Sequence, residues 1–161
     1  VTFAEALEFG KGYAAQTIKN AKALAVTLND LGLKVLGEKK GFTQSHQAVV
    51  NVLDYGDGGK IEADLEKANI IVNRQLIPGD IKAKRHYMHP GGIRLGSSEV
   101  TRLGMKESEM QEIASLIKQV VIDKKDAKEV AGRVMELRKN YQKTEYCFDN
   151  KLGAYEYVKL R

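Results

Sequence analysis

The sequence lacks the features that mark several broad classes of protein. Its 161 residues include a single cysteine, Cys147, so no disulfide forms within the chain and nothing requires an oxidising compartment. No apolar run approaches the roughly 20 residues needed to span a bilayer, and no secretory signal pattern opens the chain. With only 15 glycines and 2 prolines, collagen-like and disordered chains are also excluded. These absences predict a globular cytoplasmic protein without a membrane segment.

The charge of the chain is moderately positive. The sequence has 26 Lys and Arg against 21 Asp and Glu, which gives a formal net charge of +5. The basic residues alternate with acidic ones along most of the chain, and the densest basic cluster, Lys82 to His86, occupies one short segment. This pattern favours a small anionic ligand over a long nucleic acid.

Apolar spacing predicts most of the secondary structure. A helical period over residues 1–31 ends at Gly32, which suits a left-handed helix cap. Short aliphatic runs predict strands over residues 33–36, 47–53 and 70–73, with a short helix over residues 61–68. Residues 74–91 have neither period and contain both prolines, so we expect a long functional loop there.

The second half of the chain continues the mixed pattern. Gly92 to Gly96 alternates as a strand does, which puts Ile93 and Leu95 on one face and Arg94 on the other. Two helices follow, over residues 110–120 and 126–141, the second capped by Asp126. We therefore expect an α/β (α+β) fold in which a small mixed or antiparallel sheet is covered by helices.

Arg94 is the sharpest candidate for a binding residue. An arginine on a short strand presents a fixed fork of donors, which suits a planar carboxylate better than a lysine would. The glycines around it, Gly91, Gly92 and Gly96, would let another group approach the backbone closely. The spacing alone equally allows an exposed arginine on the polar face of a sheet.

Other reactive residue types give no site. His86 and His89 lie three residues apart in the loop but have no cysteine or carboxylate pair beside them, so we expect no metal site. For His46 we expect a structural role, with its imidazole bonded to a backbone carbonyl, and for Cys147 no reactive thiolate. The sequence also lacks a phosphate loop, a nucleophile elbow and paired catalytic carboxylates, so we predict no catalytic residue in it.

Three motifs in order resemble the C-terminal domain of serine hydroxymethyltransferases. The first is the helix containing Tyr13 and residues 19–24, and the second is the strand entry from Thr43 to His46. The third runs from Val72 through Pro78 to Ser97 and on through residues 99–107. The resemblance extends to about Val121, with a looser fit to Asn150. Several motifs in the family's order are much harder to obtain by chance than one.

The resemblance implies a small C-terminal domain of a fold-type I enzyme that depends on pyridoxal phosphate. Such an enzyme interconverts serine and glycine, and the arginine matching Arg94 binds the carboxylate of the substrate. The resemblance also implies that residues 1–150 form this small domain, that residues 151–161 are an unassigned tail, and that the large domain with the cofactor lysine is absent from this chain. Because the sequence begins at Val1 with the apolar spacing of a helix already established, we expect it to be a piece of a longer protein. We expect this piece to be inactive by itself. The resemblance implies that the full-length protein forms a homodimer or a larger assembly.

The loop resembles the family's pterin-binding loop, with Gln75 at a position where asparagine is common. The cations Lys82, Lys84 and Arg85 would then favour an anionic pterin tail. An archaeal character of the sequence leaves either tetrahydrofolate or tetrahydromethanopterin as the one-carbon carrier. Two alternatives stay open: the small domain of another amino-acid enzyme, such as an aldolase or aminotransferase, and a noncatalytic module that binds RNA through the loop cations and Tyr87.

Overall fold

The chain begins with α1 (Thr2–Asp30), a 29-residue helix that confirms the predicted opening helix. The computed structural model describes residues 2–148, so the predicted tail of residues 151–161 lies outside the described residues. Gly32 has φ of 97°, and the amides of Gly32 and Leu33 bond to the carbonyls of Asn29 and Leu28. The predicted left-handed cap therefore ends this helix.

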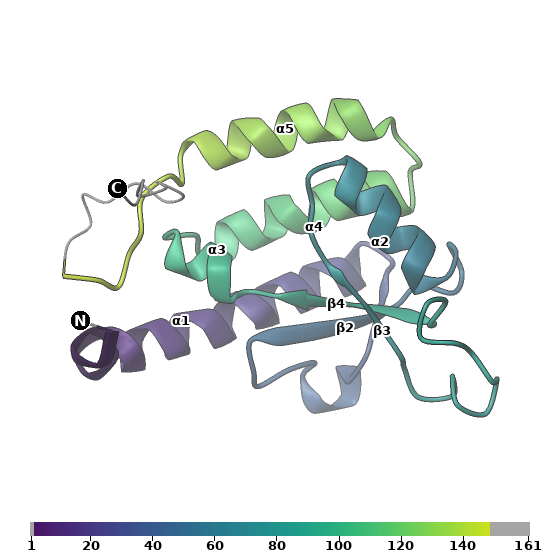
Figure 1. Cartoon of the computed structure of the whole chain (residues 1–161), viewed down its shortest axis with the longest axis horizontal. Helices are drawn as coiled ribbons and strands as arrows, with labels where there is room; N and C mark the ends of the chain where they lie inside the picture. Colours follow the sequence, from purple (N-terminus) through teal and green to yellow (C-terminus); the bar gives the residue numbers. More distant parts are fainter. Residues whose placement is uncertain (1, 149–161) are drawn as a thin grey trace, which may run out of the picture.

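Four strands form a single sheet in the order β1-β2-β4-β3, with every neighbouring pair antiparallel. The strands are β1 (Lys34–Val35), β2 (Gln47–Asn51), β3 (Asn73–Gln75) and β4 (Gly92–Gly96). Of the two sheet types expected, the antiparallel one is present. The bounds of β4 match the prediction, and this strand lies inside the sheet between β2 and β3 (Figure 1).

The predicted strand over residues 70–73 is wrong, because β3 starts only at Asn73. Asn69 has φ of 59°, and the amide of Ile70 bonds back to the carbonyl of Leu65. The apolar residues 70–72 therefore continue the helix exit instead of pairing with β4. The irregular loop is shorter than expected as well, since Arg74 and Gln75 belong to the sheet.

The helices after α1 are α2 (Gly58–Lys67), α3 (Ser98–Arg102), α4 (Glu107–Val121) and α5 (Ala127–Lys139), with a 3-10 turn, η1 (Glu38–Lys40), before β2. The predicted cap at Asp126 is confirmed, because its carboxylate accepts from the amides of Lys128 and Glu129. The short helix α3 and the turn η1 lack an apolar period and were not predicted.

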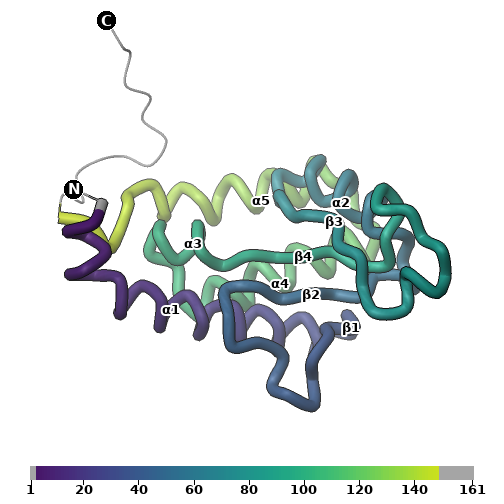
Figure 2. The backbone as a smooth tube through the Cα atoms, turned by 60° about the horizontal axis from the view of Figure 1, so that its bottom comes forward, coloured from purple at the N-terminus to yellow at the C-terminus, as the bar shows by residue number. Residues whose placement is uncertain are grey.

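All the long helices lie on one side of the sheet. α1 packs on β1 and β2, α2 packs on β3 and β4, and α4 lies against α1, α2 and α5. Figure 2 shows β2 and β4 in front of α4, with no α-helix of residues 2–148 crossing in front of these strands. The core fills the space between the sheet and the helices, with fully buried Leu28, Val50, Ile93, Met110 and Ile117.

Within residues 2–148, no helix combines the length and the apolar composition that spanning a bilayer requires.

Candidate functional site

Arg94 occupies the middle of the sheet on the face that the helices leave uncovered. It pairs with Val49 on β2 and with Asn73 on β3, while its neighbours Ile93 and Leu95 are buried on the helix side. The prediction that Arg94 lies on the other face of the strand from Ile93 and Leu95 is confirmed. Within residues 2–148 its guanidinium makes no hydrogen bond or ion pair, so its donors are available to a ligand.

Hydrogen bonds fix both ends of the strand that carries Arg94. At the start, the amide of Gly91 donates to Asp80 Oδ2 at 2.8 Å, and the Gly91 carbonyl accepts from Val52 at 3.0 Å. At the end, the amide of Ser97 donates to the carbonyl of His46 at 2.9 Å, and Ser97 Oγ donates to the carbonyl of Thr17 at 2.8 Å. The backbone around Arg94 is therefore fixed to α1, to the entry of β2 and to the loop.

Polar amides from both neighbouring strands share the uncovered face with Arg94, whose direct partner on β2 is the apolar Val49. We call this set the amide face; because side chains alternate along strands and pair in register, it comprises Gln47, Asn51, Asn73 and Gln75. Of these only Gln75 was singled out from the sequence, and strict alternation along β2 and β3 is the signal that could have found the rest. One guanidinium among neutral amides gives a face suited to an anionic group with hydrogen-bonding neighbours.

The three glycines predicted to allow a close approach differ in what lies beside them. A Cβ at Gly91 would meet Asp80 Oδ1 at 2.7 Å, and one at Gly92 would meet Ile77 Cγ2 at 2.4 Å. The group that approaches these two positions closely is therefore the chain's own loop. Gly96 is exposed, and a Cβ there would have open space around it.

The loop of residues 76–91 extends beyond the end of the sheet (Figure 1). Its cations Lys82, Lys84 and Arg85 are exposed, and Arg85 Nε lies 3.5 Å from Asp80 Oδ1. Gln75 is separate from them, on the amide face, where its side chain donates to the carbonyl of Leu76 at 2.9 Å. The structure thus places Gln75 opposite Gly92, on the same face of the sheet as Arg94, and the three cations farther out on the loop.

The base of this loop packs on the N-terminus of α2. The amide of Gly58 donates to the carbonyl of Pro90 at 2.6 Å, and a Cβ at Gly59 would lie 2.3 Å from the carbonyl oxygen of Met88. Asp57 caps the helix by accepting from the amide of Lys60, and this bond holds the pKa of the Asp57 carboxyl below its ordinary value. The base of the loop is therefore held against α2, while the cations lie on its exposed part.

The histidines have local partners. His89 Nδ1 lies 3.4 Å from Asp57 Oδ2, and His86 Nδ1 accepts from the amide of Met88 at 3.3 Å. No cluster of three potential metal ligands occurs within residues 2–148. The expectation for His46 is wrong in detail, because its exposed imidazole has no hydrogen bond within these residues. It is the His46 carbonyl that is structural, accepting from Ser97.

Cys147 is half-buried near the end of the described chain. Its thiol donates to the carbonyl of Thr144 at 3.3 Å.

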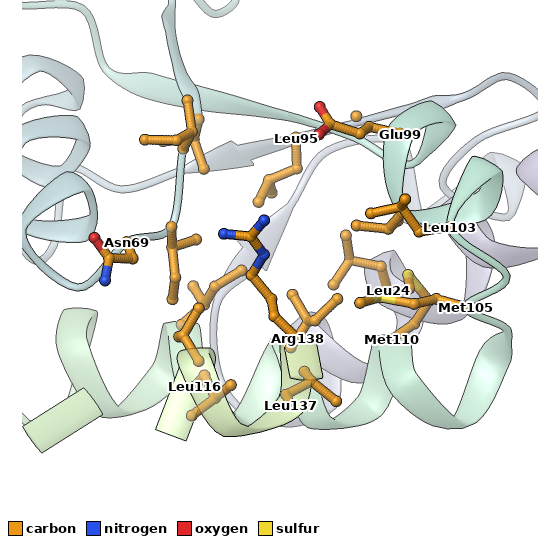
Figure 3. Close-up of a pocket in the computed structure, with 18 residues that line it drawn as sticks. Leu24, Asn69, Leu95, Glu99, Leu103, Met105, Met110, Leu116, Leu137 and Arg138 are labelled. Atoms are coloured by element: carbon orange, nitrogen blue, oxygen red, sulfur yellow. The ribbon is translucent and has the colours of Figure 1, made fainter. Parts of the chain in front are cut away.

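An apolar cleft of about 480 Å³ lies on the helix side, away from Arg94. Its walls come from β4, α3, α4, α5 and the segment before β3, and sequence reasoning missed it because these elements are far apart in the chain. Figure 3 shows Arg138 extending into the cleft from α5, with Asn69 and Glu99 at its edges. Apolar walls with few polar groups suit the binding of an apolar surface.

Comparison with known proteins assigns the family. The family model of serine hydroxymethyltransferase matches residues 1–117, which include α1, the whole sheet and Arg94. The chain belongs to the serine hydroxymethyltransferase family. This membership confirms the resemblance found in the sequence.

Curated members of the family match the chain throughout its length. The serine hydroxymethyltransferase of Nitrosopumilus maritimus is 77% identical over 161 residues, and that of Cenarchaeum symbiosum is 70% identical over 161 residues. Both alignments cover 100% of this chain but only 37% and 36% of the relatives. The chain thus spans a little over a third of their length.

A solved structure supports the same fold class. The crystal structure of L-threonine transaldolase from Pseudomonas fluorescens, in its internal aldimine state, matches with a TM-score of 0.81 and 36% identity. The match covers 94% of this chain and 34% of that protein. The fold is therefore that of the corresponding part of a fold-type I enzyme dependent on pyridoxal phosphate, as the family resemblance implied.

Proposed function

We propose that this chain is the substrate-carboxylate-binding part of a serine hydroxymethyltransferase that interconverts serine and glycine. The whole enzyme would be a glycine hydroxymethyltransferase that transfers the one-carbon unit to a reduced pterin. Family membership supports this reaction class. The observation that carries the residue assignment is the position of Arg94, which lies at the centre of the uncovered sheet face without a partner in residues 2–148.

Arg94 would bind the α-carboxylate of serine or glycine through two parallel N–H···O bonds. This geometry fixes both the position and the orientation of the amino acid. The orientation determines which bond at the α-carbon reacts. The strand ends fixed at Gly91 and Ser97 reduce the freedom that binding would otherwise remove. The role of this chain is therefore to orient the substrate.

Pyridoxal phosphate, when bound, supplies the electron sink of this chemistry. Its attachment requires a lysine whose amine is desolvated or otherwise activated, and no lysine in residues 2–148 is buried. The described residues therefore fit the binding of the substrate carboxylate and not the attachment of the cofactor. We expect the attachment lysine to lie outside this chain, and the 161 residues to be inactive alone.

For the pterin, we propose that Gln75 contacts the ring system and that Lys82, Lys84 and Arg85 attract its anionic tail. Support comes from the place of Gln75 on the amide face and from the exposure of the loop cations. Either tetrahydrofolate or tetrahydromethanopterin fits this charge. A comparison of the two carriers in turnover assays of the full-length enzyme would decide between them. We further propose that the full-length enzyme is a cytoplasmic homodimer, which sedimentation and fractionation would test.

Steady-state kinetics of the full-length enzyme test the assignment of Arg94. Arg94→Lys keeps one charge but loses the fork of donors, so we expect the KM for serine to rise about tenfold and kcat to fall. Arg94→Ala should have a larger effect. The matched control is Arg133→Lys on α5, whose guanidinium bonds to Gln119 on the helix side. Unchanged serine KM and kcat in Arg94→Lys would contradict the assignment.

The similarity to the transaldolase favours one second candidate, an aldol-type amino-acid enzyme of the same fold. Such an enzyme would cleave or transfer a hydroxyalkyl group without a pterin. Serine turnover that is independent of added pterin would favour this candidate over the hydroxymethyltransferase. The RNA-binding alternative receives no support from the family match.

A further inference from the structure

Asp80 is the one buried ionisable residue among residues 2–148, with only 2% of its surface exposed. Burial of a carboxylate is costly unless hydrogen bonds and an opposite charge compensate it. A carboxylate that is retained at such a position therefore has partners that matter to the structure. In Asp80 the two carboxylate oxygens have different partners.

The first oxygen closes the loop. Asp80 Oδ2 accepts from the amide of Ile77 at 2.9 Å and from the amide of Gly91 at 2.8 Å. These two residues stand near the beginning and at the end of the loop, and Gly91 directly precedes β4. Since the Gly91 carbonyl also bonds to Val52, this oxygen fixes the start of the strand that carries Arg94.

The second oxygen contacts the loop cation nearest to it. Asp80 Oδ1 lies 3.5 Å from Arg85 Nε, and the amide of Arg85 also bonds to the carbonyl of Asp80. Asp80 therefore holds Arg85 in place through two contacts, one from the Asp80 backbone carbonyl and one from the Asp80 carboxylate. One residue thus contacts the strand of Arg94 through one oxygen and the cationic loop through the other.

We propose that Asp80 is a positioning residue that couples the carboxylate-binding strand to the pterin-binding loop. This inference rests on the proposed function, because it assigns the strand to the amino acid and the loop to the pterin. The two oxygens separate its effects. Loss of Oδ2 should disturb serine binding, whereas loss of the charge on Oδ1 should release Arg85 and disturb pterin binding.

Two substitutions distinguish these effects in the full-length enzyme. Asp80→Ala removes both oxygens, so the KM values for serine and for the reduced pterin should each rise about fivefold or more. Asp80→Asn can keep its carbonyl oxygen on the amides of Ile77 and Gly91 while its NH₂ group faces Arg85. The serine KM should then stay within about twofold of the wild-type value, and the pterin KM should rise as much as in Arg85→Gln. Asp123→Asn, at an exposed ion pair with Lys118, is the control and should leave both KM values unchanged.

The outcomes that overturn the proposal are specific. The first is a serine KM in Asp80→Ala that stays within about twofold of the wild-type value, and the second is equal serine KM values in Asp80→Ala and Asp80→Asn. The third is an Asp80→Ala variant that loses thermal stability while its KM values for serine and pterin are unchanged. If Asp80→Ala does not fold, the comparison of Asp80→Asn with Arg85→Gln decides, and unequal pterin KM values overturn the coupling. The proposed function itself fails separately, when the wild-type enzyme shows no pterin-dependent turnover of serine or when Arg94→Lys leaves serine kinetics unchanged.

Discussion

The side-chain nitrogen of Asn20 on α1, Nδ2, donates to the hydroxyl oxygen of Thr101 at 2.8 Å, and the two residues lie 81 positions apart in the sequence. The same nitrogen donates to the carbonyl of Met105 at 2.8 Å, and Thr101 Oγ1 donates in turn to the carbonyl of Ser97 at 2.7 Å. Both Asn20 and Thr101 are fully buried. This network connects α1 to the segment directly after β4, and so supports the strand that carries Arg94.

Substitution of Asn20 tests how much this hydrogen-bond network contributes to the free energy of unfolding. In Asn20→Ala the buried carbonyl of Met105 loses its amide donor, and Thr101 Oγ1 loses one partner. We expect the free energy of unfolding to fall by about 2 kcal/mol in denaturant titrations. Lys11→Ala, at an exposed position of the same helix, should change it by less than about 0.5 kcal/mol. Equal stability of the two variants would show that the network contributes little.

The glycines of β4 give a matched pair of substitutions. In Gly92→Ala the new Cβ would stand 2.4 Å from Ile77 Cγ2 and 2.8 Å from the carbonyl oxygen of Val50. We expect a loss of about 2 kcal/mol in the free energy of unfolding, because the backbone carbonyl has little freedom to move. Gly96→Ala meets nothing within 4 Å and should leave stability nearly unchanged. Thermal melts of both variants check this, and a Gly96→Ala variant as unstable as Gly92→Ala would contradict it.

Gly96→Ala also tests whether a ligand approaches the sheet there. If the substrate lies against this open position, the serine KM of the full-length enzyme should rise about threefold or more without a loss of stability. An unchanged KM would mean that no ligand contacts Gly96.

Asp57 gives the fold a defined dependence on pH. Its carboxyl accepts from the amide of Lys60, which lowers its pKa in the folded state below the value of about 3.8 expected for the unfolded chain. The resulting stabilisation is fully present above the unfolded pKa and is lost as the pH falls through the folded pKa. Asp57→Asn should keep the cap but remove this part of the acid dependence, whereas Asp57→Ala should lower stability at pH 7 by about 1 kcal/mol. Urea titrations from pH 2 to pH 7 measure both, and a wild-type acid profile in Asp57→Asn would refute the assignment.

The local sequence pattern was enough to predict the elements whose structure depends mainly on residues adjacent in sequence. The period of α1, the positive φ at Gly32 and the alternation of β4 all depend on neighbours in sequence, and all three are confirmed. The position of Arg94 follows directly from that alternation. Its role follows from the family resemblance and stays a prediction.

The remaining features depend on contacts between distant residues. The apolar run at residues 70–72 looks like a strand, but the left-handed turn at Asn69 directs it away from β4. Gly91 and Gly92 indicate a close approach by some group, but only the folded loop shows that this group consists of Ile77 and Asp80. Alternation within β2 and within β3 indicates which amides share a face of each strand, but only the register of the three strands brings them to the face of Arg94. Tertiary packing therefore decides what local spacing leaves open.

A crystal structure of the full-length protein with glycine bound tests the central claim most directly. We predict that both terminal nitrogens of Arg94 lie about 3 Å from the two carboxylate oxygens of glycine, in a paired arrangement. A structure in which the glycine carboxylate is held by other groups, with the Arg94 guanidinium directed into bulk water, would contradict the account.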